Sequence, residues 1–224
     1  MGLFGPTRQE RHAAAATALA PYGFRLDPQR ANNVLSYTPF AAIVAPSTCH
    51  MAVFGQIESA RVEAYEYTYQ STDAEGGVTY ADEFVVVVQH PWIVGGATFA
   101  PDLRAWGGVY SVIDALLWIP PFTLVKLVQL FGDKEPDRAV GHGEFDRLYK
   151  VRAASDDDAA RAIPQGLREL FVRAQLRATV ELRPGVLLYS LFDHRLDDKT
   201  AVAAVGFAGA IIAALEPTSA HPMR

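Results

Sequence analysis

The pattern of apolar and polar positions is most regular late in the chain. From Arg177 to Arg183 apolar and polar residues alternate, and this period of two indicates a strand with one buried face. Pro184 and Gly185 follow, and they are the residue types that a type II turn requires. The apolar run from Val186 to Phe192 then predicts a second strand that is covered on both faces.

Four segments that precede this hairpin in the sequence also have the pattern of strands. Ala60–Gln70 and the valine-rich Thr79–Gln89 flank a polar turn, and together they predict an antiparallel hairpin. Val53–Gln56 and Glu144–Arg152 are the other two predicted strands. Residues 24–51 contain several prolines and are expected to be loop with short extended pieces.

Capping signals predict helices at both ends of the chain and before the late hairpin. Thr7-Arg-Gln-Glu10 is a capping box ahead of an alanine-rich run. Acidic residues at the start of Ser155–Leu176 complement the positive N-terminal end of a helical segment. Asp198 is expected to cap a helix from Lys199 to Glu216.

These elements predict an α+β fold. We expect a mainly antiparallel sheet of about six strands with helices packed on it, including the C-terminal helix. A two-sheet arrangement of the pleckstrin-homology type is the alternative. Residues 1–224 are expected to form a single domain, with an apolar helical segment at 109–131 and a flexible tail at 217–224.

Composition narrows the classes of partner and compartment. A chain of 224 residues, half of them hydrophobic, can bury a core without a metal or disulfide. Its net charge of −5 argues against a general nucleic-acid binder. Cys49 is the single cysteine and the N-terminus lacks a signal-peptide pattern, so a cytoplasmic protein is expected.

The familiar catalytic and cofactor motifs are missing from the sequence. It contains no Gly-x-Gly-x-x-Gly, P-loop, Gly-x-Ser-x-Gly or His-Glu-x-x-His segment. An enzyme is not excluded, because catalytic groups need not be close in sequence. The balance favours a non-enzymatic protein without a cofactor.

Weak candidates for chemistry remain. Cys49 and His50 place a nucleophile beside a base, although adjacent residues seldom point at one another. Three histidines at predicted strand ends are candidate metal ligands, whereas the acidic run at 156–158 is better explained by helix capping. The three histidines are His90, His142 and His194.

Tyr65, Tyr67 and Tyr69 share one face of a predicted strand. They are candidates for stacking on a ligand or base, and the alternative is packing against a helix.

The segment 109–131 is the main candidate for partner binding. It carries only two charged residues, and Pro120 and Pro121 should divide it into two short helices. These helices are expected either to cover the sheet or to contact a protein partner or a membrane surface. The predicted partner-binding side chains are Leu116, Leu117, Val128 and Phe131.

Several segments resemble a loose group of uncharacterised bacterial proteins. Tyr65–Tyr69 matches their Tyr-x-Tyr strand, and Pro121–Phe122 matches their Pro-x-Phe segment. Phe145–Val151 corresponds to a Phe-x-x-x-Tyr-x-Val strand, and Val186–Tyr189 corresponds to a late apolar strand. The resemblance covers about half of the chain and implies no activity.

Three hypotheses of function follow. The first is a non-enzymatic binding or accessory domain that acts through a protein partner or by self-association. The second is a small hydrolase that depends on a metal or on Cys49 and His50. The third is a peripheral membrane module.

Overall fold

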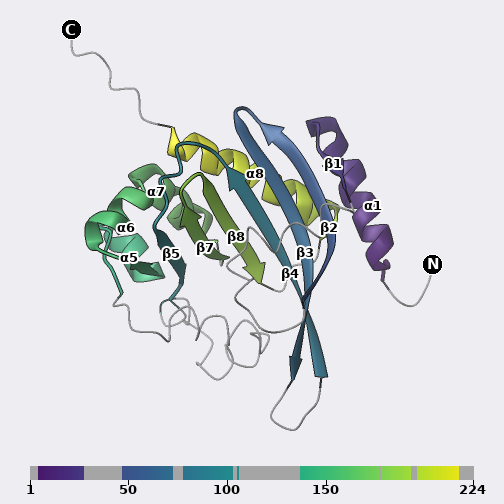
Figure 1. Cartoon of the computed structure of the whole chain (residues 1–224), viewed down its shortest axis with the longest axis horizontal. Coiled ribbons are helices and arrows are strands. Elements are labelled where there is room, and N and C mark those ends of the chain that lie inside the picture. The colour runs from purple at the N-terminus through teal and green to yellow at the C-terminus, as the bar shows by residue number, and fades with distance from the viewer. Residues whose placement is uncertain are drawn as a thin grey trace.

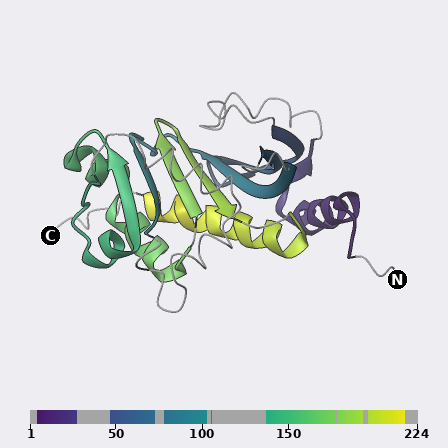
Figure 2. The same cartoon turned by 90° about the horizontal axis from the view of Figure 1, so that it is seen from below.

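The computed structural model describes residues 5–27, 47–72, 78–102, 105, 137–176, 178–192 and 196–216. Its strands form one sheet of eight strands with helices packed on one face (Figures 1 and 2). The strands are β1 (Arg25–Leu26), β2 (Ser47–Ile57), β3 (Ala60–Thr72), β4 (Val78–Gln89), β5 (Ala97–Pro101), β6 (Tyr149–Ala153), β7 (Ala178–Arg183) and β8 (Val186–Phe192). The helices are α1 (Arg8–Leu19), the short 3-10 helix η1 (Ala20–Tyr22), α5 (Gly143–Leu148), α6 (Asp156–Ala162), α7 (Gln165–Ala174) and α8 (Asp198–Leu215).

Every pairing in the sheet is antiparallel, in the order β1-β2-β3-β4-β8-β7-β5-β6. The hairpin β3–β4 and the hairpin β7–β8 are both confirmed. Between them, β4 pairs with β8 from Glu83↔Phe192 to Gln89↔Val186. This pairing joins two segments that are distant in the sequence into one sheet.

The main core lies between the sheet and its helices. Helix α8 crosses behind the strands in Figure 1 and lies below them in Figure 2. The hydroxyl of buried Tyr189 on β8 donates a 2.8 Å hydrogen bond to the Ala204 carbonyl of α8. Helices α7 and α8 approach closely at Gly166, where a Cβ would lie 2.7 Å from the Ala214 carbonyl oxygen. Glycine at this position therefore sets the spacing of the two helices.

An aromatic cluster fills the other end of this core. The ring of Phe99 on β5 makes edge contacts with Phe145, Tyr149 and Phe171. The Tyr149 hydroxyl donates to the carbonyl of Leu176 at 3.0 Å, so its polar atom is satisfied within the apolar surroundings. The cluster ties α5, β6 and α7 to the edge of the sheet.

The predicted helix caps are largely confirmed. Thr7 and Glu10 form the capping box of α1, and the Ser155 side chain accepts from the Asp158 amide at the start of α6. The cap of α8 was placed one residue too late. Asp197, rather than Asp198, accepts from the Thr200 amide, at 2.7 Å.

The predicted strand Glu144–Arg152 is wrong in its first half. Residues 143–148 form helix α5, and only Tyr149–Ala153 is strand. The Asp146 carboxylate accepts hydrogen bonds from the amides of Val140, Gly141 and His142. It thereby fixes the turn that starts the helix, and Phe145 and Leu148 face the core at helical spacing.

The α+β class, the antiparallel sheet and the C-terminal helix are confirmed, but the strand count is not. The structure has eight strands, two more than predicted. The short strand β1 lies in the segment expected to be loop with short extended pieces, and β5 lies in a segment for which no strand was predicted. The described strands belong to one sheet, so the two-sheet alternative is wrong for them. The segments 109–131 and 217–224 lie outside the described residues.

The turn between β7 and β8 provides a test of the fold. Gly185 has a φ of 77°, and a Cβ there would meet nothing within 4 Å. Gly185→Val is therefore expected to cost roughly 1 kcal/mol through backbone strain alone. Urea unfolding would measure the loss, with Gly143→Val as control because Gly143 has open space and no positive φ. Equal stability of the two variants would contradict the turn.

Candidate functional site

The structure does not bring Cys49 and His50 together as a catalytic pair. Cys49 packs with Tyr65 and Tyr67 on the sheet face opposite α8. The His50 ring lies on the helix face, with Nε2 2.8 Å from Thr68 Oγ1 and 3.1 Å from Arg8 Nη1. A bulge between Cys49 and Met51 separates the orientations of the two side chains.

The surroundings of Cys49 also oppose nucleophilic chemistry. Burial raises the pKa of its thiol to about 12, and hydrogen bonds with the Met51 backbone and Tyr67 oppose this shift only in part. A thiol with this pKa stays protonated at neutral pH, and the thiolate is the reactive form. The site therefore favours a packing role for Cys49.

The described histidines of the predicted metal site lie in separate turns. His90 Nδ1 accepts from the Trp92 amide at 3.2 Å, and its Nε2 lies 2.8 Å from Ser59 Oγ. His142 Nδ1 accepts from the Phe145 amide at 3.2 Å and caps α5. His194 lies outside the described residues. Within the described ranges, no three His, Cys, Asp or Glu side chains are placed to hold a metal ion.

Tyr65 and Tyr67 are 2% and 0% exposed, and their ring centroids are 6.4 Å apart. They pack with side chains of neighbouring strands on the face opposite α8, so no described helix covers them. Their burial removes both rings as an open stacking platform. The side chain of Tyr69 is outside the described set.

The side chains predicted to bind a partner belong to the segment 109–131. Leu116, Leu117, Val128 and Phe131 all lie outside the described residues.

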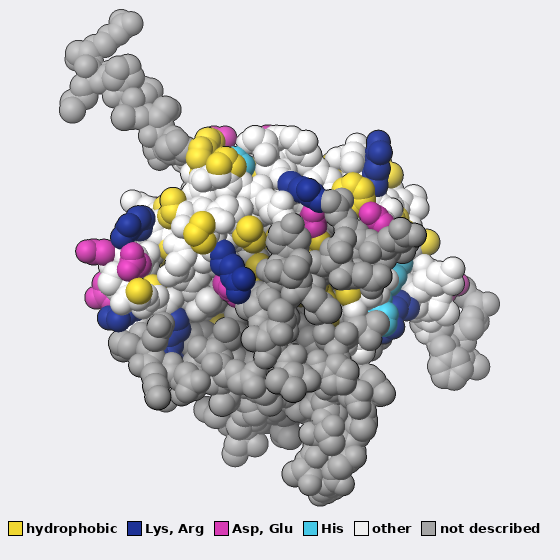
Figure 3. Space-filling model, in the orientation of Figure 1, with side chains coloured by type: hydrophobic (Ala, Val, Ile, Leu, Met, Phe, Trp, Pro, Cys, Tyr) yellow, Lys and Arg dark blue, Asp and Glu magenta, His cyan; other side chains and the backbone are white. Residues whose placement is uncertain are grey.

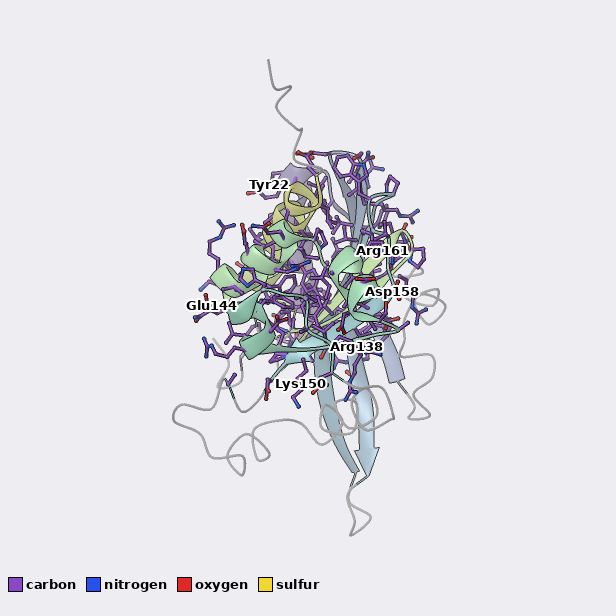
Figure 4. All side chains as sticks on the ribbon, turned by 90° about the vertical axis from the view of Figure 1, so that its left-hand side faces the viewer. Tyr22, Arg138, Glu144, Lys150, Asp158 and Arg161 are labelled. Atoms are coloured by element: carbon purple, nitrogen blue, oxygen red, sulfur yellow. The ribbon has the colours of Figure 1, made fainter. Side chains whose placement is uncertain are left out.

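The end of the molecule formed by α5, β6 and α6 carries charges of both signs (Figure 4). Arg161 pairs with Asp158 at 2.8 Å, and Lys150 pairs with Asp137 at 3.4 Å. The acidic run at 156–158 lies in the first turn of α6, as the capping interpretation predicts. Paired charges of this kind form a mixed polar surface.

Among the described residues, the most buried ionic group lies between α1 and the sheet. Glu66 on β3 has a side chain that is 0% exposed, and Arg11 Nη2 lies 2.9 Å from its carboxylate. His12 makes a short contact with the other carboxylate oxygen, and Arg8 Nε lies 3.9 Å away. Three basic side chains of one helix thus converge on one buried carboxylate.

This cluster was not identified from the sequence, although a signal was present. Tyr65 and Tyr67 were assigned to one face of the strand, so Glu66 had to lie on the other face with Val62 and Ala64. A carboxylate on a buried face needs a partner, and the helix ahead of it supplies basic residues. Burial opposes ionisation of Glu66, but His12 and Arg11 outweigh it and hold its pKa below the ordinary value.

An apolar groove of about 380 Å³ lies beside α8, on the helix side of the sheet. We call it the α8 groove. Its floor is formed by buried Leu19, Phe24 and Val205, and its rim includes the exposed Tyr22 and Val202. Figure 4 places Tyr22 on the helix side. The last residues of β2, Gln56 and Ile57, close the groove.

Glycines create the shape of this groove. A Cβ at Gly55 would lie 2.6 Å from the Phe24 ring, so glycine lets this ring lie against the strand. Gly206 and Gly209 on α8 also line the groove, and a Cβ at Gly206 would meet nothing within 4 Å. Among the described residues, the lining contains no charged side chain. It therefore suits an uncharged, apolar group.

Comparison with known proteins identifies the fold and not a family. No family model matches the sequence, and no curated protein matches it. The structure is similar to the crystal structure of the mycobacterial trehalose monomycolate transport factor A, TtfA, with a TM-score of 0.52. The sequences are 12% identical, and the match covers 91% of this chain and 93% of that chain. At this identity the similarity extends to the fold alone.

Helix α8 is, by length and composition, apolar enough to cross a membrane. Its 18 residues have a mean hydropathy of 1.5, and 39% of them are buried in the structure. The core helix of a soluble protein meets the same criterion. Here α8 packs on the sheet, on α1 and on α7.

Removing the buried carboxylate tests the cluster at Glu66. Glu66→Gln is expected to lower the free energy of unfolding by about 3 kcal/mol, because it leaves the largely buried Arg11 and His12 without their counter-charge. Urea unfolding measures the change. Glu169→Gln on the exposed side of α7 is the control, and equal effects would contradict a structural role for Glu66.

The stability difference between wild type and Glu66→Gln is expected to depend on pH. Because the folded state lowers the pKa of Glu66 from its ordinary value of 4.5, the ionised group stabilises the fold above that value. This contribution is lost as the pH falls through the folded pKa. The stability difference between wild type and Glu66→Gln should therefore shrink in acid, and a constant difference would argue against it.

Cys49 is expected to react slowly with a thiol reagent in the folded protein, because burial keeps the thiol protonated. Labelling with Ellman's reagent in native buffer and in urea measures the contrast. Native labelling as fast as in urea would show an accessible thiolate instead.

Proposed function

We propose that this protein is a non-enzymatic accessory protein that binds a protein partner through the α8 groove. The observation that carries the proposal is an open, uncharged groove whose rim holds exposed apolar side chains, Tyr22 at 61% and Val202 at 36%. The proposed occupant is the apolar face of a partner's amphipathic helix.

The chemistry of the described residues supports binding more than catalysis. Cys49 and His50 face opposite sides of the sheet, and His90 and His142 are engaged in local turns. This arrangement gives no support to the hydrolase hypothesis. This protein shares its fold with TtfA, which is named as a transport factor, and that similarity fits an accessory role.

The size and form of the groove favour a protein side-chain surface over an enclosed small ligand. Small-molecule sites commonly have volumes of about 300–1,000 Å³ and bury most of the ligand. The α8 groove, at about 380 Å³, is at the lower end of this range and is bordered by exposed residues. Tyrosine at such a rim is a residue type enriched in protein interfaces.

Filling the groove tests the proposal. Gly206→Leu would place a side chain into open space, and it should leave stability unchanged or raise it by up to about 1 kcal/mol, because glycine is unfavourable in helices. It is expected to abolish partner binding. Ala213→Leu is the matched control, since Ala213 is exposed on the same helix and does not line the groove.

Affinity capture with quantitative mass spectrometry, together with sedimentation velocity, measures the effect. Proteins recovered by wild type and by Ala213→Leu but lost with Gly206→Leu would support the proposal. If wild type self-associates and only Gly206→Leu is monomeric, the partner is a second copy of this chain. Identical behaviour of all three proteins would overturn the proposal.

A further inference from the structure

The sheet face opposite α8 has a symmetric arrangement of charges at one end. The strand register places β3, β4, β8 and β7 side by side. In the outermost row, Arg61 pairs with Gln89, Gln89 with Val186, and Val186 with Arg183. The row behind it is Glu63, Val87, Leu188 and Glu181. Each row thus has a charged residue at both ends. Gln89 and Val186 lie between them in the outermost row, and two apolar residues lie between them in the row behind it.

Each of the two arginines is oriented by a glutamate in the neighbouring row. Arg61 Nε lies 2.6 Å from the carboxylate of Glu63, whose side chain is 3% exposed. Arg183 Nε pairs in the same way with Glu181, whose side chain is 12% exposed. The arginine side chains are themselves 46% and 50% exposed. Within the described part of the chain, their terminal Nη groups make no hydrogen bond or ion pair.

A rigid loop adds apolar side chains at the same end of the sheet. Residues 90–96 cross the β7–β8 turn, where the His90 amide donates to Gly185 and the Gly185 amide donates to Ile93. Gly95 lies so close to the backbone of Arg183 that a Cβ there would approach it to 2.2 Å. Ile93 is buried, while Trp92 and Val94 are 41% and 52% exposed. The backbone contacts of the loop therefore hold Trp92 and Val94 at the surface.

Figure 3 views this face of the molecule. Basic side chains lie next to acidic ones on the upper part of the face, with hydrophobic side chains between them.

We infer that this end of the sheet is a second docking surface, separate from the α8 groove, for an extended acidic segment of a protein partner. Arg61 and Arg183 are three strand spacings apart, about 14 Å. Carboxylates four residues apart on an extended chain are separated by about 13 Å, with one side chain midway between them on the same side. The expected segment has an acidic residue at each end and an apolar residue at its centre.

Charge and residue type favour this occupant over a lipid surface. An arginine oriented through Nε keeps a fork of donors that matches a carboxylate in geometry. Trp and Arg are the residues that contribute most often to the centres of protein interfaces. Two arginines are also fewer than the roughly four to eight clustered basic residues that are typical of a site for an anionic membrane surface.

Two synthetic peptides of equal composition test the inference. Gly-Glu-Thr-Leu-Thr-Glu-Gly has the required spacing, whereas Gly-Leu-Glu-Thr-Glu-Thr-Gly places the same carboxylates two residues apart. NMR titration of the full chain should show that the first peptide binds more tightly and perturbs Arg61, Trp92 and Arg183. Arg61→Gln and Arg183→Gln should each weaken its binding by at least about tenfold, since each removes a charge-assisted hydrogen bond.

Arg173→Gln, at an exposed position on α7, and Gly206→Leu are the controls, and both should retain peptide binding. Loss of binding in Gly206→Leu would mean that the peptide occupies the α8 groove, which would overturn the inference. Equal binding of both peptides, no binding of either, or no effect of the arginine variants would also overturn it. Flotation with phosphatidylcholine vesicles containing phosphatidylglycerol, if lost in Trp92→Ala, would identify a lipid surface and sink the protein-segment proposal.

Discussion

The pairing of β4 with β8 is the constraint on which the rest of the molecule depends. It runs from Glu83↔Phe192 to Gln89↔Val186 and unites the β1–β4 half of the sheet with the half formed by β8, β7, β5 and β6. Because side chains alternate across a strand, this one register decides which residues of both halves share a face. The core beneath α8 and the charged rows on the opposite face both follow from it.

The sheet separates two kinds of surface. On the helix face, Glu66 is held by basic residues of α1, and the end of that helix leads through η1 into the wall of the α8 groove. On the other face, Glu63 and Glu181 are held beneath exposed arginines. On both faces a carboxylate of the sheet pairs with a basic side chain that is more exposed than the carboxylate, and it fixes the position of that side chain. The buried carboxylates thus organise both surfaces.

The sequence was most informative where local pattern and local structure agree. The alternation at 177–183, the Pro184-Gly185 turn and the apolar run after it predicted β7 and β8 closely. The helix at 143–148 was missed because six residues show little periodicity. The contacts that begin it join the Asp146 carboxylate to the amides of residues 140–142, and a pattern of apolar positions does not mark such a turn. The candidate surfaces were also missed. The groove depends on Phe24, Ile57 and Gly206 meeting in space, and the spacing of Arg61 from Arg183 depends on a strand order that no local pattern encodes.

The position of α8 has a consequence for how the chain reaches this structure. All eight strands precede α8 in the sequence, yet α8 covers β3 and β4 and binds β8 through Tyr189. A growing chain folds from its N-terminal side. The apolar face of a nearly complete sheet therefore stays exposed until residues 198–215 have been synthesised and α8 can pack on it. During that interval the exposed apolar face makes the nascent protein prone to aggregate, and the packing of α8 ends the exposure.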